Sequence, residues 1–130
     1  MTDYEERRNY PRITVEGANV AYKVRQSFDL FNRYSSFQPL RDLAKGGVSF
    51  ELDSEVTKGA TVELRLNIPG EKRIPVKGIV VWTNNITNNG RVFAGVQFLP
   101  FGKGRMYNSF ECWDKLEQII SVHYDTKDLN

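Results

Sequence analysis

Hydrophobic and polar residues alternate with a period of two in several parts of the chain. In residues 61–68, TVELRLNI, the apolar side chains occupy every second position: Val62, Leu64, Leu66 and Ile68. Successive side chains of a β-strand point to opposite faces, so this pattern predicts a strand with one buried and one solvated face. Residues 47–52 and 91–98 repeat the alternation. Residues 73–82 are β-branched and apolar, which predicts a longer and more buried strand.

The segments between these strands are rich in Gly, Pro, Asn and Asp, as in PGEK and NNITNNG, which favours turns between antiparallel neighbours. A first strand is predicted at about 13–25. Its apolar positions change parity after Val15, so we expect a β-bulge near Gly17. Residues 27–37, SFDLFNRYSSF, have no clean period and predict a loop whose aromatic side chains fold back onto the domain.

After residue 98 the period changes to that of an α-helix. One stripe of apolar residues contains Met106, Phe110, Trp113, Leu116 and Ile120. The stripe predicts a helix over about 104–122 that covers an apolar surface. About six short strands followed by one helix predict an all-β fold with one C-terminal helix. We expect a small six-stranded antiparallel β-barrel capped by that helix, because closure leaves no exposed strand edges.

Composition narrows the classes of function. A chain of 130 residues with a formal net charge of +2 is one domain without the strong positive field of a nucleic-acid-binding protein. Cys112 is the only cysteine, which excludes an intramolecular disulfide. The N-terminus is charged and no apolar run is long enough for a membrane span. These features predict a cytoplasmic protein without membrane insertion or a nucleic-acid partner.

Enzymatic chemistry finds little support in the sequence. His123 is the only histidine, and no Cys, Asp or Glu stands at metal-ligand spacing from it. No motif of a catalytic nucleophile surrounds the Ser, Thr or Asp residues. We therefore expect no enzyme, no metal and no cofactor.

Two short motifs are more informative together than apart. RRNYPR, residues 7–12, precedes the first predicted strand, and DLAKGG, residues 42–47, lies at a turn between strands. Alone, the first would be a solvated tail and the second an ordinary turn. In this order and context they resemble the PilZ domain, the bacterial receptor module for cyclic di-GMP. That family has R-x-x-x-R before its first strand and [D/N]-x-S-x-x-G at a strand turn.

Arg8 and Arg12 match the first motif, and Asp42 and Gly47 match the second, which has Ala44 where serine is usual. The segments KGIVVW and FAGVQF and the C-terminal helix are also similar to the family. The resemblance implies cyclic di-GMP as the ligand. The ligand-binding residues that it implies are Arg7, Arg8, Arg12, Asp42, Ala44 and Gly47.

The chemistry of the ligand agrees with these residue types. The planar fork of arginine bonds bidentately to phosphate oxygens or to O6 and N7 of guanine. Asp42 can accept hydrogen bonds from the N–H groups of the guanine Watson–Crick edge. Gly47 permits a positive φ or a close approach of the ligand. Residues 1–12 are then a flexible tail carrying the arginine motif, and residues 13–124 form the PilZ-like barrel domain with its helix.

The resemblance implies a single-domain receptor that passes the cyclic di-GMP signal to an unidentified partner protein, in the control of motility, biofilm formation or exopolysaccharide production. Two alternatives stay open. The first is a PilZ-like protein-interaction module that has lost nucleotide binding, for which Ala44 is the only sequence argument. The second is a small barrel that binds single-stranded nucleic acid. The acidic residues interspersed among the basic ones argue against this second alternative.

Overall fold

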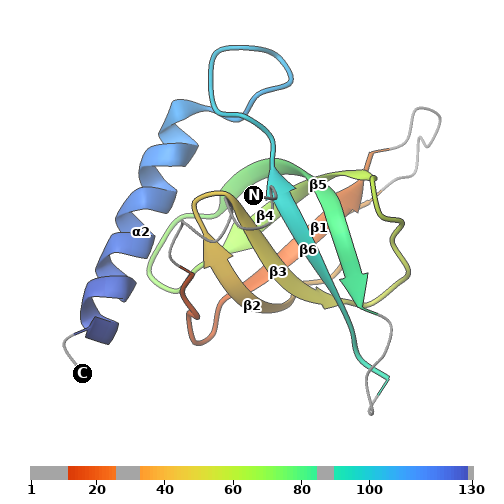
Figure 1. Cartoon of the computed structure of the whole chain (residues 1–130), viewed down its shortest axis with the longest axis horizontal. Coiled ribbons are helices and arrows are strands. Elements are labelled where there is room, and N and C mark those ends of the chain that lie inside the picture. The colour runs from red at the N-terminus through yellow and green to blue at the C-terminus, as the bar shows by residue number, and fades with distance from the viewer. Residues whose placement is uncertain (1–11, 26–32, 85–89, 129–130) are drawn as a thin grey trace, which may run out of the picture.

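The computed structural model describes residues 12–25, 33–84 and 90–128, and it consists of one β-barrel and one helix (Figure 1). Its elements are the strands β1 (Asn19–Val24), β2 (Gln38–Ala44), β3 (Gly47–Leu52), β4 (Thr61–Asn67), β5 (Ile74–Asn84) and β6 (Val92–Phe98), and the helix α2 (Phe110–Asp128). The predicted all-β fold with one C-terminal helix is confirmed. Of the predicted tail, only Arg12 is described, so Arg7 and Arg8 lie outside the described residues.

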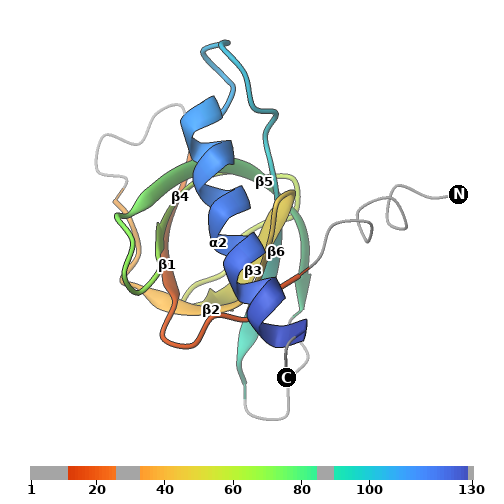
Figure 2. The same cartoon turned by 90° about the vertical axis from the view of Figure 1, so that its left-hand side faces the viewer.

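The six strands form a closed antiparallel barrel in the order β1-β2-β3-β6-β5-β4. Each strand therefore has two hydrogen-bonded neighbours, and β3 and β4 lie on opposite sides of the ring. Figure 2 shows the ring from one end, with α2 crossing in front of its opening. The prediction that the helix caps the barrel is correct, because an apolar helix face needs an apolar surface to cover.

The alternation in the sequence gives the barrel its core. Val62, Leu64, Leu66 and Ile68 are all buried, while the intervening residues of β4 are partly or fully exposed. In β3 the inward positions are Val48, Phe50 and Leu52. Each fully buried side chain of this size contributes about 1.5–3 kcal/mol through removal of apolar surface from water. The inward positions thus hold the barrel together and leave the outward ones available for binding.

The first predicted strand is wrong in its N-terminal half. Residues 16–17 form a turn, with Gly17 at φ 80°, and β1 begins only at Asn19. Glycine adopts this left-handed conformation without steric cost, so the chain reverses there instead of forming a bulged strand. Ile13 instead forms a single β-bridge to Leu43 of β2, with N–O distances of 2.9 Å in both directions.

The helix begins later than predicted, at Phe110 instead of about 104, and extends to Asp128 instead of ending near 122. The Ser109 hydroxyl accepts a hydrogen bond from the Cys112 backbone N–H at 3.1 Å, which caps the first turn. Met106 and Phe110 are 53% and 55% exposed and so do not belong to the buried stripe. The helix face that packs on the barrel contains Cys112, Leu116, Ile119 and Ile120.

Residues 33–37 follow the prediction of a loop with aromatic side chains against the barrel. The Arg65 guanidinium of β4 lies 3.8 Å from the ring centroid of Tyr34, and the Arg73 guanidinium lies 4.8 Å from that of Phe37. Such cation–π contacts fix an aromatic ring on a polar surface. The remainder of the predicted loop, residues 27–32, falls outside the described residues.

Candidate functional site

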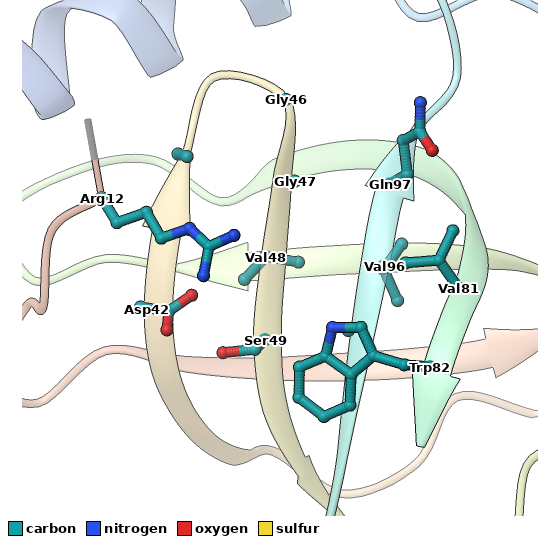
Figure 3. A pocket seen from close by; sticks show the side chains of 12 residues that line it. Arg12, Asp42, Gly46, Gly47, Val48, Ser49, Val81, Trp82, Val96 and Gln97 are labelled. Atoms are coloured by element: carbon teal, nitrogen blue, oxygen red, sulfur yellow. The ribbon is translucent and has the colours of Figure 1, made fainter. Parts of the chain in front are cut away.

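A pocket of about 150 Å³ lies on the outer face of the barrel, over β2, β3, β6 and β5 (Figure 3). Among its lining residues are Arg12, Asp42, Ala44, Gly47, Ser49 and Trp82. Four of these, Arg12, Asp42, Ala44 and Gly47, belong to the two sequence motifs. The structure thus brings together residues from two motifs that are separated in the sequence by strand β1.

Strand register arranges the pocket floor in rows. Asp42 pairs with Ser49, Ser49 with Gly95, and Gly95 with Trp82, so one row crosses four strands. A second row continues from Ala44 to Gly47, which in turn pairs with Gln97. Directly opposed residues of neighbouring strands have Cβ atoms about 4.5–5.5 Å apart. Side chains at adjacent positions of a row are therefore close enough to contact one bound group.

Two β-bulges turn Asp42 and Trp82 to this outer face. The register of β2 shifts between Leu40 and Asp42, and that of β5 shifts between Val80 and Trp82. Leu40 and Val80 are buried in the core, so strict alternation would have put the residues two positions later inside as well. A bulge inserts one extra residue and re-aims the side chains that follow. The two register shifts thus place the side chains of Asp42 and Trp82 at the pocket.

Arg12 enters the pocket from the side of β2. The bridge between Ile13 and Leu43 holds the chain beside that strand, and Figure 3 shows the guanidinium of Arg12 directed over β2, near Asp42. Within residues 12–25, 33–84 and 90–128, neither the Arg12 guanidinium nor the Asp42 carboxylate has a hydrogen-bond or ion-pair partner. Both groups are thus available to a ligand.

Two ion pairs lie close to the pocket. Arg91 donates two hydrogen bonds of 3.0 Å to Glu51, which is two residues beyond Ser49 on the same face of β3. These hydrogen bonds lower the pKa of the Glu51 carboxyl below its ordinary value. Lys45 pairs with Glu117 of α2 at 3.6 Å. Unlike these groups, Arg12 and Asp42 have no charged partner among the described residues.

Gly47 is required by backbone packing. Of the two predicted roles, a positive φ and a close approach of the ligand, the first is not observed, because Gly47 is not among the glycines with positive φ. A Cβ at this position would lie 2.4 Å from the Val96 carbonyl oxygen, far inside van der Waals contact. Glycine therefore permits β3 to approach β6 closely at the pocket floor.

Gly95 has a different role, because it makes room for Trp82. A Cβ on Gly95 would lie 2.1 Å from the Trp82 Nε1 atom, so the indole lies directly over the glycine. Figure 3 shows this ring crossing β6 from the side opposite Arg12. The Trp82 side chain is 38% exposed. An aromatic face beside a pocket is a platform on which a planar base can stack.

Ser49, Trp82 and Gly95 were not predicted as site residues. The alternation of residues 91–98 had placed Val92, Ala94, Val96 and Phe98 inward, which already put Gly95 on the outward parity. An outward glycine within a strand is a signal for close approach by another group. In the part of the chain that the structure describes, no group of three or more His, Cys, Asp or Glu residues could bind a metal ion.

Comparison with known proteins gives a consistent result. A family model described as PilZ domain matches residues 6–105. No curated protein matches the chain. Several solved structures do match it.

The PilZ domain of YcgR from Escherichia coli, solved with c-di-GMP, has a TM-score of 0.63 and 16% identity over 93% of this chain and 94% of that one. The K. pneumonia MrkH–c-di-GMP complex has a TM-score of 0.66 and 15% identity over 93% of this chain and 54% of MrkH. Bacillus subtilis MotI/DgrA, an inhibitor of motility, has a TM-score of 0.63 and 14% identity over 93% of this chain.

The chain spans about half the length of MotI/DgrA, 52% of it, and nearly all of the isolated YcgR domain. At these identities the structural matches show a common fold. The family model covers residues 6–105, which is most of the chain, and both sequence motifs lie within that range. The chain therefore belongs to the PilZ domain family.

Proposed function

We propose that this PilZ domain is a receptor for cyclic di-GMP, which binds in the pocket on the outer face of β2 and β3. The observation that carries the proposal is that Arg12, Asp42, Ala44 and Gly47 line one pocket. The family consists of ligand-binding modules, and the solved YcgR and MrkH structures contain c-di-GMP. We further propose that the bound domain signals to a partner protein in the cytoplasm, in control of motility, biofilm formation or exopolysaccharide production.

The proposed contacts follow from the chemistry of each group. The Asp42 carboxylate accepts from the N–H groups on the guanine Watson–Crick edge. The Arg12 guanidinium donates two parallel hydrogen bonds to a phosphate or to guanine O6 and N7. Trp82 provides a face for stacking of the base. Charge and hydrogen bonding are thus available from the β2 side of the pocket and stacking from the opposite side.

The volume of the pocket limits how much ligand it holds. Pockets for whole small molecules have volumes of about 300–1,000 Å³, whereas this one has about 150 Å³. We therefore propose that one guanine enters the pocket and the phosphates lie above β2 and β3. Arg7 and Arg8 precede the described residues and remain predicted contacts to these phosphates.

Thermal unfolding tests the proposal. A ligand that binds only the folded state stabilises it by about 2.7 kcal/mol at a free concentration one hundred times its Kd. Cyclic di-GMP is expected to raise the melting temperature of the domain, while GMP at the same guanine concentration raises it much less. An unchanged melting temperature with millimolar cyclic di-GMP would contradict the proposal.

Position 44 provides a gain-of-affinity prediction. Ala44 lines the pocket where the family has serine, so Ala44→Ser is expected to add one neutral hydrogen bond to the ligand. Such a bond is worth about 0.5–1.5 kcal/mol, or roughly two- to tenfold in affinity. Calorimetric titration of both proteins measures the change. Equal or weaker binding by a variant of unchanged melting temperature would show that position 44 does not face the ligand.

Ala44 also supports the second candidate function, an interaction module without a nucleotide. In that case the pocket would be a remnant, and neither cyclic di-GMP nor GMP would change the melting temperature. Restoring the serine would then restore little or no binding. The same titrations therefore separate the two functions.

A further inference from the structure

Ser49 lies in the middle of the pocket floor, between Asp42 on one neighbouring strand and Gly95 on the other. Its side chain is 4% exposed. Among the residues that the structure describes, its hydroxyl is the buried side-chain group left without a hydrogen-bond partner. A buried hydroxyl without a partner is unfavourable, because it has lost its hydrogen bonds to water. Such a group in a folded protein requires an explanation.

Asn108, the other buried polar residue in the described part of the chain, has hydrogen-bond partners for its side-chain amide. Asn108 accepts a hydrogen bond from the Lys77 backbone N–H at 2.7 Å and donates to the carbonyls of Lys77 at 3.0 Å and Leu99 at 2.9 Å. It thereby fixes the segment before α2 to β5. Ser49 has no comparable structural role in the protein alone, and it faces the pocket.

We propose that the Ser49 hydroxyl binds the guanine of cyclic di-GMP, donating a hydrogen bond to O6 beside the N–H groups that Asp42 accepts. The inference rests on the proposed function and adds a contact that neither sequence motif contains. Cβ atoms of directly paired residues are about 4.5–5.5 Å apart, and Figure 3 shows the Ser49 hydroxyl turned toward β2 and Asp42. The guanine edge presents O6 next to N1–H, so a hydroxyl next to a carboxylate matches its order of acceptor and donors.

The same geometry relates Ser49 to the missing serine. Asp42 and Ala44 point to one face of β2, and their partners Ser49 and Gly47 point to the same face of β3. A hydroxyl at position 49 is therefore one row away from a hydroxyl at position 44. Ser49 thus supplies to the ligand a hydroxyl that Ala44 cannot.

Substitution of Ser49 by alanine tests the inference. Ser49→Ala removes the hydroxyl and leaves the barrel core untouched, because the inward side chains of β3 are Val48 and Phe50. The affinity for cyclic di-GMP, measured by calorimetry, is expected to fall about two- to tenfold. The melting temperature of the ligand-free variant is expected to stay the same or rise, because an unsatisfied polar group has been removed. Ser121→Ala, on the exposed side of α2, is the control and should bind like the unchanged chain.

The outcomes separate this inference from the proposed function. If the unchanged chain binds cyclic di-GMP and Ser49→Ala binds equally well, the inference is overturned and the proposed function stands. A lower melting temperature of ligand-free Ser49→Ala also overturns it, because the hydroxyl would then have a partner in the free protein. If the unchanged chain does not bind, both are overturned.

Discussion

Replacing Arg12 by alanine is expected to weaken cyclic di-GMP binding about 10- to 150-fold while leaving the melting temperature of the free domain nearly unchanged. Charge-assisted hydrogen bonds contribute about 1.5–3 kcal/mol each, which corresponds to this range. In the described part of the protein the Arg12 guanidinium has no partner, so its removal breaks no internal contact. Calorimetric titration gives the affinity, and thermal unfolding gives the stability.

Arg65→Ala is the matched control for this substitution. Arg65 also points outward, but it lies on β4, opposite β3 in the ring, where its guanidinium contacts Tyr34. Loss of a general positive field would weaken binding equally in both variants, because each loses one positive charge. A specific contact at Arg12 predicts a large loss for Arg12→Ala and little change for Arg65→Ala. Equal losses would mean that Arg12 acts only through diffuse attraction.

Removal of the Trp82 side chain is expected to weaken binding to a similar extent. Stacking of a base on an aromatic side chain is worth about 1–3 kcal/mol, or roughly 5- to 150-fold in affinity. The indole of Trp82 lies over Gly95 beside the pocket and is partly exposed, so its free face is available without rearrangement of the core. Trp82→Ala should therefore lose affinity without losing the barrel fold. Calorimetry measures this loss.

The second tryptophan provides the control. Trp113 belongs to α2 and packs edge to face against Phe101, with ring centroids 4.9 Å apart. Trp113→Phe should bind cyclic di-GMP like the unchanged chain and should still show a ligand-dependent change in tryptophan fluorescence. In Trp82→Ala the same change should disappear. Retention of full affinity by Trp82→Ala would exclude stacking on this ring.

The sequence predicts the barrel well because the apolar residues at every second position of a strand are the ones that form the core. Val62, Leu64 and Leu66 repeat at period two, and in a two-faced strand this period requires one buried face. The closed arrangement follows because six short strands would otherwise expose edges. Arg12, Asp42 and Gly47 were singled out by the resemblance of the two motifs to the PilZ family, and their role in binding stays a prediction.

The two register shifts are the part that alternation does not predict. Read strictly, period two puts Trp82 on the same face as the buried Val80, inside the barrel. The bulge at Val81 depends on pairing with β6, which is a non-local contact with no local sequence signal. The alternation does not identify Ser49 as a site residue, for a related reason. Its side chain is on the outward parity of β3, and only the paired strands and the adjacent indole reveal that the position is buried.

At the start of the helix the sequence does contain a local signal for the correct boundary. The longer apolar pattern, however, indicates an earlier start. Ser109 is a favoured N-cap residue, yet the apolar spacing of Met106 and Phe110 continues the helical stripe toward the N-terminus. Gly102 and Gly104 precede Tyr107 in a turn, where a helix would be disfavoured by two glycines. Capping chemistry was therefore the better guide to the boundary.

A titration of the ¹⁵N-labelled domain with cyclic di-GMP, followed by NMR, tests the central claim most directly because it reports both binding and its location. We expect the largest amide shifts at Asp42, Ser49 and Gly95, with a shift of the Trp82 indole N–H and little change along β4. No shifts at saturating ligand, or shifts confined to β4 and α2, would contradict binding in this pocket.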